Sequence, residues 1–422
     1  MLPLSRRQFL TASAGLLSIP AGVYRSALYA ADAPSERIRV GMIGVGNQGG
    51  PSNNLKYFQK NVVAVCDVDS NFLTRAVASQ EKGGHATPKA HGDFRKLLDQ
   101  KDVDAVCITV PDHWHMLMTV MACEAGKHVY CEKPLTLTVA EGPKMIEAAR
   151  KNKKIVQTGS MQRSAREFKV ANDLVRNGAV GKVHTVKVGI PKPNWIDRAK
   201  MPVPDSKPPA ELNFDLWQGP APERPYNKNR VHYLFRFFWD YSGGQQTNFG
   251  AHHLDIAQWG LGMDESGPVS VEGTAVYNPD GWYETPDSTE ITYKYANGVV
   301  MHCGQAYQYG TEFIGDKGSL FVSRGVLRAN PAEIIKDVEW KRKDDPMSIL
   351  THIDNFLECI RSGARPVCDV AIGHRSATVC HLGNIAVRTG RKITWDPKEE
   401  TIVGDKDAAK MLSKEYRKPW VF

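Results

Sequence analysis

The sequence contains eight cysteines but no Cys-x-x-Cys pair, the spacing typical of zinc sites and of thioredoxin-like redox sites. Several cysteines lie inside apolar runs, as in residues 63–66 and 105–108. Cysteines in such runs are typical of buried thiols, which pack as small hydrophobic side chains. The pattern therefore predicts free thiols in a fold that is completed in a reducing cytosol.

The sequence also lacks any run of basic residues interleaved with aromatic ones, although its formal net charge is +8. The positive excess is mild and scattered, so nucleic acid is not an expected partner. Long apolar runs are scarce as well. The apolar stretch at residues 11–20 is short, and Pro20 and Arg25 interrupt it, so no stable membrane span is expected.

The N-terminus follows a different plan from the rest of the chain. Ser5-Arg6-Arg7-Gln8-Phe9-Leu10 precedes the apolar stretch, and Ala31-Asp32-Ala33 ends the segment. This basic, apolar, small-residue order is typical of an export signal, and its paired arginines resemble the twin-arginine type. Residues 1–33 are therefore predicted to be a signal peptide that directs the protein to the periplasm. A basic amphipathic terminus is the alternative.

The length of 422 residues predicts two domains, because a single hydrophobic core rarely serves more than about 250 to 300 residues. The first domain, residues 34–160, opens with an apolar strand at residues 37–43. A glycine-rich segment follows this strand. Glycines at its spacing permit a tight turn, and they let backbone N–H groups approach a pyrophosphate at the start of a helix. The segment is a dinucleotide fingerprint, Gly44-Val45-Gly46-Asn47-Gln48-Gly49.

An acidic residue stands where the ribose of an adenosine would be held. The apolar strand at residues 62–66 ends at Asp67, at an offset of about 20 residues from the glycines. Asp69 adds negative charge nearby, and a 2′-phosphate would be repelled there. The pair therefore favours NAD over NADP as cofactor. An ordinary turn residue at the end of a strand is the other interpretation of Asp67.

Apolar strands and helical segments alternate through this first domain. Strands are expected at residues 105–109, 128–131 and 155–159, and a helix at residues 116–125. This alternation predicts an α/β fold with a doubly wound parallel sheet of the Rossmann type. Ligands of such sheets lie beyond the carboxyl ends of the strands, which is where Glu132-Lys133-Pro134 falls.

The second domain, residues 161–422, is expected to be α+β with a large, mostly antiparallel sheet, because its strands are short and separated by turn residues. The long stretch from Pro191 to Trp239 has little periodicity and is typical of a binding loop or cover. The helices at residues 348–362 and 372–388 are expected to pack near the domain junction. The expected strands cover residues 183–190, 269–277, 289–295, 299–305 and 320–322.

Polar residues are concentrated between Gly243 and Trp259. If Asn248 caps a helix, then Asn248, His252 and Asp255 fall at i, i+4 and i+7 on one face. A metal site is the alternative, since His252-His253 and His113-x-His115 look like ligand fragments. Adjacent helical residues point about 100° apart, and no third ligand accompanies the second pair, so no metal is predicted.

Taken together, these motifs resemble the Gfo/Idh/MocA family, named for glucose-fructose oxidoreductase and inositol dehydrogenase. The resemblance covers the whole mature chain. It implies sugar or cyclitol substrates bound between the two domains, and homo-oligomers formed through the C-terminal sheet. Asn248 departs from the family pattern, which has an Asp there; an amide cannot stabilise an imidazolium by charge. The matching segments are residues 44–49, Asp67, residues 109–115, residues 132–134 and residues 177–183.

The resemblance and the motifs together assign candidate site residues. The catalytic candidates are Lys133, His252, Asn248 and Asp255. His253 is also carried as a substrate candidate, although a core role is favoured for it, and Trp195, Trp217 and Trp239 are candidates for stacking on a sugar. The cofactor candidates are Gly44, Gly46, Asn47, Gln48, Gly49, Asp67, Thr109, Pro111, His115, Glu132 and Lys133, and the other substrate candidates are Arg163, His232, Arg236 and Asp240.

Oxidation of a secondary alcohol needs a base for the hydroxyl proton and a cation near the developing oxyanion. The first assignment makes His252 the base and Lys133 the cation, with Asn248 and Asp255 orienting them; the swapped assignment stays open. Because free NAD is scarce outside the cytosol, an exported enzyme must keep its cofactor bound and reoxidise it in place. The alternatives to a sugar oxidoreductase are a redox-neutral NAD-dependent glycoside-cleaving enzyme and a non-catalytic, nucleotide-containing sugar-binding protein.

Overall fold

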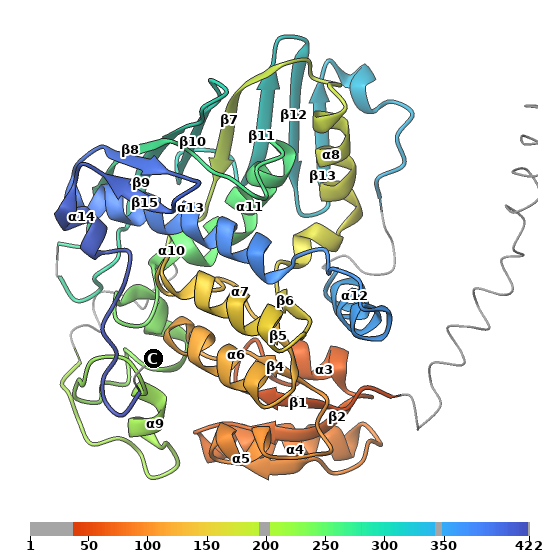
Figure 1. Cartoon of the computed structure of the whole chain (residues 1–422), viewed down its shortest axis with the longest axis vertical. Coiled ribbons are helices and arrows are strands. Elements are labelled where there is room, and N and C mark those ends of the chain that lie inside the picture. The colour runs from red at the N-terminus through yellow and green to blue at the C-terminus, as the bar shows by residue number, and fades with distance from the viewer. Residues whose placement is uncertain (1–36, 194–202, 280, 342–347, 421–422) are drawn as a thin grey trace, which may run out of the picture.

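The computed structural model describes residues 37–193, 203–279, 281–341 and 348–420 (Figure 1). The predicted signal peptide and Trp195 lie outside the described residues. Two sheets dominate the structure, a smaller one built from the first part of the chain and a larger one built from the second. All eight cysteines are buried and free, as predicted. Within the described ranges, no helix is long and apolar enough to cross a membrane.

The first sheet is parallel throughout, with six strands in the order β3-β2-β1-β4-β5-β6, which confirms the doubly wound Rossmann fold. Its central strands β1, β2 and β4 are almost entirely buried, because helices cover both faces. The strands are β1 Val40–Ile43, β2 Val62–Cys66, β3 Lys89–His91, β4 Ala105–Ile108, β5 His128–Cys131 and β6 Val156–Thr158. The helices are α3 Asn54–Phe58, α4 Ser70–Lys82, α5 Phe94–Leu98, α6 His115–Glu124 and α7 Glu141–Lys151.

The second sheet has nine strands in the order β13-β12-β11-β7-β10-β9-β8-β14-β15. Every pair is antiparallel except β7 with β10, so the expected mostly antiparallel sheet is confirmed. Four of the strands, β11, β13, β14 and β15, were not predicted from the sequence. The nine are β7 Val183–Gly189, β8 Ser270–Val276, β9 Ser288–Lys294, β10 Val300–Gly304, β11 Gly310–Gly315, β12 Gly318–Ser323, β13 Val326–Asn330, β14 Ile393–Asp396 and β15 Thr401–Val403.

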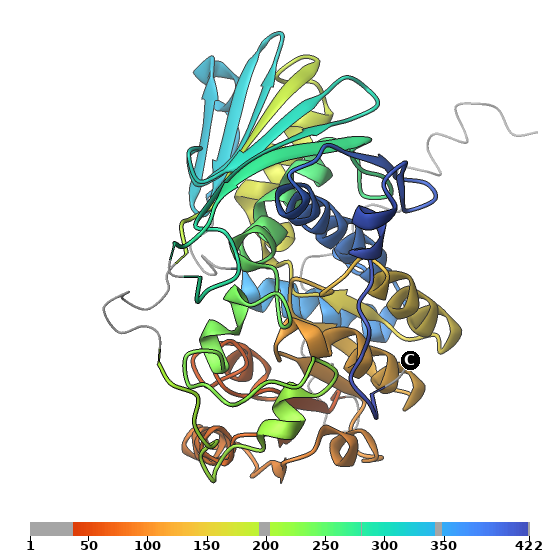
Figure 2. The ribbon, with the colours of Figure 1, turned by 90° about the vertical axis from the view of Figure 1, so that its left-hand side faces the viewer.

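Helices fill the space between the two sheets (Figures 1 and 2). The long helix α13 packs against α7 of the first domain and against α11 and β8 of the second. Its contact with β6 is close, because a Cβ on Gly373 would lie 2.0 Å from Thr158 Oγ1. The two domains therefore share a tightly packed boundary. The α-helices of the second domain in the described residues are α8 Arg166–Arg176, α9 Phe214–Gln218, α10 Gly244–Asn248, α11 Gly250–Gly260, α12 Ile349–Ser362, α13 Val370–Thr389 and α14 Lys406–Lys410.

Candidate active site

The glycine fingerprint forms a tight turn directly after β1. Gly44 has a φ of +81°, which favours glycine, and a Cβ on Gly49 would lie 1.8 Å from the Gly44 carbonyl oxygen. The expected helix does not begin at the glycines. Turns occupy the next residues, and α3 starts only at Asn54 and has five residues, with no side-chain cap from Asn53. The loop thus fits a closely approaching pyrophosphate, but the helix behind it is short.

The strand-end acid Asp67 is fixed by backbone N–H groups. Its Oδ2 accepts a hydrogen bond from Val45 N at 2.8 Å, and its Oδ1 accepts one from Asp69 N at 3.0 Å. Burial raises the pKa of Asp67 to about 6, against these hydrogen bonds, which lower it. Asp69 itself caps α4 through Asn71 N at 2.8 Å. Asp67 therefore holds the glycine loop to β2 while it lines the cavity described next.

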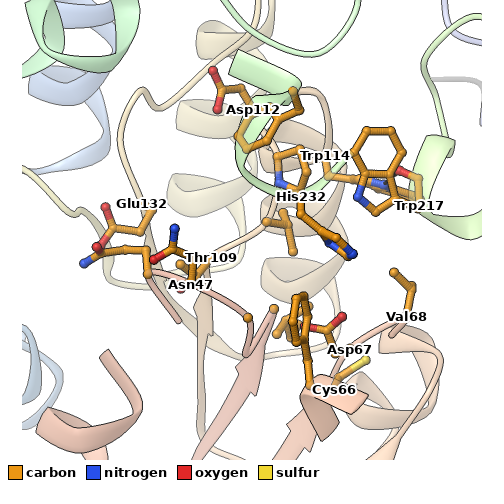
Figure 3. A pocket seen from close by; sticks show the side chains of 18 of the residues that line it. Asn47, Cys66, Asp67, Val68, Thr109, Asp112, Trp114, Glu132, Trp217 and His232 are labelled. Carbon is orange, nitrogen blue, oxygen red and sulfur yellow. Dashed lines mark hydrogen bonds between the residues drawn. The ribbon is translucent and has the colours of Figure 1, made fainter. Parts of the chain in front are cut away.

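A cavity of about 430 Å³ lies at the carboxyl ends of the parallel strands (Figure 3). Most of the predicted cofactor residues line it, namely Gly44, Gly46, Asn47, Gln48, Asp67, Thr109, Pro111, Glu132 and Lys133. Gly49 and His115 are not among the lining residues. Gly49 packs against the backbone of Gly44, and the ring nitrogens of His115 lie 2.7 Å from Pro134 O and 2.9 Å from Val110 O. His115 thus contacts the backbone at the cavity lining and does not line the cavity itself.

The side chain of Lys133 crosses from the first domain to the second. Its Nζ donates to both the backbone oxygen and the Oδ1 of Asn248, each at 3.0 Å. Burial lowers the pKa of Lys133 to about 8, although the charge of Glu132 opposes this shift. Glu132 is held in turn by Asn54 Nδ2, which donates to Glu132 Oε1 at 3.0 Å. Asn54 was missed in the sequence, because only the fold brings α3 beside the end of β5.

The expectation that Asn248 caps the helix carrying His252 is wrong. Asn248 is the last residue of α10, and Phe249 separates it from α11, so its side chain faces Lys133 and Gln245 instead. His252 is buried, and its Nδ1 has no hydrogen-bond partner among the described residues. Burial, together with the charge of Lys133, lowers the pKa of His252 well below its usual value. The imidazole is therefore neutral at neutral pH.

Asp255 does not orient Lys133 or His252, contrary to the sequence prediction. Its carboxylate accepts hydrogen bonds from Arg163 Nε at 2.8 Å and Nη2 at 2.8 Å, and from the hydroxyl of Ser376. Arg163 also binds Asp264, at 2.7 Å. Both side chains of the Arg163–Asp255 pair are almost completely buried. Arg163, predicted as a sugar contact, is thus committed with Asp255 to a structural ion pair.

The other predicted substrate residues divide into two groups. His232 and Arg236 line the cavity, where His232 Nε2 lies 3.3 Å from Asp69 Oδ2. Asp240 is not free for a sugar, because it pairs with Arg224 at 2.5 Å and Lys414 at 2.5 Å. The ring of His253 is fully buried, with its Nδ1 2.7 Å from Gly189 O, which fits the core role.

The aromatic candidates Trp217 and Trp239 have different surroundings. Trp217 is buried, lines the cavity and stacks with Phe214 at a ring distance of 5.8 Å. The ring of Trp239 is covered by the guanidinium of Arg388, 4.5 Å from its centre. Trp217 is therefore placed to contact a bound nucleotide, whereas Trp239 is already stacked.

Asp112 lines the cavity, although it was not among the candidate site residues predicted from the sequence. It is buried, lines the cavity beside Pro111, and accepts a hydrogen bond from Ser242 of the second domain. Burial raises its pKa. Its place in residues 109–115, directly after β4, was the available signal, since strand ends of this sheet meet the ligand.

The histidine pairs are not arranged as metal ligands. His113 Nε2 lies 3.1 Å from the Trp217 carbonyl oxygen, and both ring nitrogens of His115 face carbonyl oxygens. No cluster of three or more His, Cys, Asp or Glu side chains able to hold a metal occurs in the part of the chain that the structure describes. Of the predicted catalytic residues, Lys133 lines the cavity, whereas Asn248, His252 and Asp255 are not among its lining residues.

Comparison with protein families agrees with this geometry. A family model described as "Oxidoreductase family, NAD-binding Rossmann fold" matches residues 38–160, and one described as "Oxidoreductase family, C-terminal alpha/beta domain" matches residues 165–422. The chain belongs to the Gfo/Idh/MocA family. It is accordingly an oxidoreductase with a NAD-binding domain, and the glycine turn and Asp67 fit that cofactor.

Individual relatives in this family have several activities. The chain is 27% identical to a myo-inositol 2-dehydrogenase of Thermotoga maritima over 385 residues, which are 87% of this chain and 100% of the relative. It is 32% identical to a glycosyl hydrolase family 109 protein of Shewanella putrefaciens over 154 residues, 35% of this chain and 33% of the relative. The WlbA dehydrogenase of Bordetella pertussis, solved with NADH and UDP-GlcNAcA, shares the fold with a TM-score of 0.63 at 18% identity, over 85% of this chain and 99% of WlbA.

Proposed function

We propose that this protein transfers hydride between a secondary alcohol of a sugar or cyclitol and a NAD that stays bound. The observation that carries the proposal is the placement of Lys133, which lines the nucleotide cavity and whose Nζ is held by Asn248, four residues before His252. An amine in the cavity, and a buried neutral imidazole whose pKa the charge of Lys133 lowers, provide the cation and the base that alcohol oxidation needs. The myo-inositol 2-dehydrogenase relative supports a polyhydroxylated substrate.

The surroundings of the two groups favour one assignment of roles. His252 is neutral, and its Nδ1 has no hydrogen-bond partner among the described residues, which supports assigning this imidazole as the base for the hydroxyl proton. Lys133 has a pKa of about 8, so at neutral pH its ammonium can stabilise the oxygen. Bound NAD supplies the acceptor for the hydride. Asn248 acts as a positioning residue for Lys133, since both of its oxygens accept from Nζ.

This assignment predicts the pH dependence of sugar oxidation. The value of kcat/KM is expected to fall as the pH rises through about 8, because the ammonium of Lys133 loses its proton there. Initial rates measured from pH 6 to pH 10, roughly the range over which this amine titrates, test the direction. The variant Lys133→Arg should lose the alkaline decline, because arginine stays charged. A rise through pH 8 in the wild type would instead make Lys133 the base.

The predicted export signal adds a requirement for cofactor recycling. If residues 1–33 direct the folded protein to the periplasm, a second carbonyl compound must take the hydride back from the bound cofactor. A redox-neutral cycle is the second candidate. A ring hydroxyl would be oxidised, and the keto group would acidify the adjacent C–H. Loss of that proton to a base and departure of the protonated glycosidic oxygen would leave a double bond. Water would add across this double bond, and the hydride would then return to the keto group. The similarity to a glycosyl hydrolase family 109 protein, over 154 residues, supports this redox-neutral cycle as the second candidate.

One experiment separates these functions. The purified protein is examined for co-purified nucleotide, and the absorbance band of NADH is followed while sugars, cyclitols and glycosides are added. Reduced cofactor that persists until a carbonyl acceptor is supplied is expected for net oxidoreduction. Glycoside cleavage without accumulated NADH would assign the redox-neutral cycle. If broad substrate sets give neither result, the proposed function is rejected.

A further inference from the structure

An arginine of the second sheet lies close to the strand end that carries Lys133. Arg324 is the first of the two residues that join β12 to β13, and its Nε donates to Gln162 Oε1 at 3.3 Å. Gln162 lies just beyond β6 of the first domain, where a Cβ on Gly159 would be 2.9 Å from the carboxylate of Glu132. The hydrogen bond therefore holds Arg324 beside the edge of the first sheet that presents Glu132 and Lys133.

Contacts within the second domain place the same turn near Lys133. The Nζ of Lys133 lies 6.0 Å from the centre of the Phe249 ring. That ring lies 6.2 Å from the ring of His252 and 5.8 Å from the ring of Tyr309. Tyr309 directly precedes β11, which pairs antiparallel with β12, so the start of β11 and the end of β12 share one end of the sheet. Arg324 and Tyr309 therefore both lie at the sheet end that faces Phe249 and His252.

Charge interactions agree with this position of Arg324. Burial is the main cause of the lowered pKa values of Lys133 and His252, and the charge of Arg324 contributes to both shifts. The charge of Glu132 opposes the shift of Lys133, but this carboxylate already accepts a hydrogen bond from Asn54 at 3.0 Å. Like charges close together in a buried site are unfavourable, so a ligand with a negative charge would stabilise this arrangement.

Arg324 has no negatively charged partner among the described residues. It is half-buried, and the acceptor of its one hydrogen bond within the described ranges is the neutral amide of Gln162. Glu167 contacts the same turn, because its Oε1 accepts from Gly325 N at 3.0 Å, but it forms no salt bridge with Arg324. Gln162 is buried, and its Nε2 also lacks a partner in the part of the chain that the structure describes. A guanidinium and a neighbouring amide N–H group thus both lack an acceptor.

A carboxylate matches these donors in geometry and in charge. The two terminal nitrogens of a guanidinium lie in one plane and can bind both oxygens of a carboxylate together. A carboxylate carries one negative charge, whereas a phosphate monoester carries about 1.5 to 2 at neutral pH. Lys133 is assigned to the oxygen of the reacting hydroxyl, so Arg324 provides one further positive charge at this end of the second sheet. That single charge fits a carboxylate.

We propose that the substrate is a polyhydroxylated acid, of the uronate or aldonate class, whose carboxylate pairs with Arg324 while the hydroxyl to be oxidised lies at Lys133 and His252. This inference rests on the proposed function and narrows its substrate class. Arg324 is then the residue that determines specificity for charge. The substrate contacts both domains, because Lys133 belongs to the first and Arg324 to the second.

The test measures equilibrium binding to the full-length protein loaded with NADH, because the reduced cofactor cannot oxidise an alcohol during the titration. Calorimetry compares each acid with its neutral counterpart: glucuronate with glucose, galacturonate with galactose, and gluconate with sorbitol. At least one acid is expected to bind roughly 10- to 100-fold more tightly than its counterpart, the range typical of one charge-assisted interaction. This preference should shrink as the salt concentration rises, because salt screens the charges.

Variants of the β12–β13 hairpin show whether Arg324 is responsible. Arg324→Gln should lose the preference for the acid and bind the neutral sugars and NADH as the wild type does, and Arg324→Lys should keep part of the preference. The matched control is Arg328→Gln, which removes an exposed arginine of the same hairpin, stacked on Phe321 at 4.7 Å. This control should leave every affinity unchanged.

The proposal is overturned if no acid binds more tightly than its neutral counterpart, or if Arg324→Gln keeps the preference. It is also overturned if this variant loses affinity for neutral sugars and NADH to the same extent, since Arg324 would then be structural. Tighter binding of glucose 6-phosphate than of every acid would overturn the assignment to a carboxylate. These outcomes leave hydride transfer untouched. Conversely, an acid that binds through Arg324 but does not reduce bound NAD would contradict hydride transfer and leave the anion site in place.

Discussion

Replacing Lys133 with methionine is expected to lower the rate of hydride transfer to bound NAD by roughly 10³-fold, with the cofactor still bound. The ammonium that stabilises the developing oxyanion is removed, and a single such donor contributes on the order of 10² to 10³ in kcat. Methionine keeps much of the chain length, so the wall of the cavity is preserved. Single-turnover reduction of the bound cofactor, followed at the NADH absorbance band, measures the effect.

The control for this variant is Lys60→Met, which changes an exposed lysine in the turn before β2. Its single-turnover rate should match that of the wild type, and both variants should retain nucleotide on purification. If Lys133→Met transfers hydride within about threefold of the wild-type rate, a difference too small for a lost oxyanion donor, then Lys133 is not a catalytic residue. The charge near the nicotinamide would then have to come from another group.

Replacing Asp255 with asparagine is expected to cost about 3 to 5 kcal/mol in the free energy of unfolding, because it leaves the buried guanidinium of Arg163 without its main partner. Arg163 and Asp255 are both almost fully buried, and two guanidinium nitrogens of Arg163 donate to Asp255 at 2.8 Å. Chemical denaturation of the wild type and the variant measures the difference. This large loss of stability would come from the unpaired charge left on Arg163. It is not the net contribution of the Arg163–Asp255 ion pair to the free energy of unfolding.

Asp264 provides the matched comparison for Asp255. It binds the same guanidinium at 2.7 Å, but its side chain is 27% exposed, so water can replace it. Asp264→Asn should therefore cost much less, about 1 kcal/mol. If Asp255→Asn proved as stable as the wild type but lost hydride transfer, the original sequence prediction of a catalytic role for Asp255 would be restored.

Much of the nucleotide domain could be predicted from its sequence because its signals are local. A buried parallel strand is a short continuous apolar run, and the predicted strand at residues 62–66 coincides with β2. The glycine spacing and Asp67 lie within one βαβ unit, so their relation in space follows from their relation in sequence. In the second domain, β11 escaped prediction because glycines bound it at both ends, and β15 has only three residues.

The candidate site was predicted only in part, because residue spacing cannot show which groups are already paired. On a helical wheel Asp255 lies on the same side as His252, yet Arg163, 92 positions earlier in the chain, takes its carboxylate. Asn248 was expected to cap a helix, but the break at Phe249 turns its oxygens to Lys133. Asn54 and Asp112, which were not candidates, become part of the site only where distant elements meet.

The sequence by itself determined most strands of the nucleotide domain, the dinucleotide fingerprint and the presence of Lys133 and His252, since these depend on short-range patterns of apolar, glycine and polar residues. Only the tertiary structure decided which charges remain free. Arg163 and Asp255 neutralise each other in the core, whereas Lys133 and Arg236 face the cavity without carboxylate partners among the described residues. The physical reason is that a buried charge must be paired, and long-range packing alone determines whether its partner is another side chain or a bound ligand.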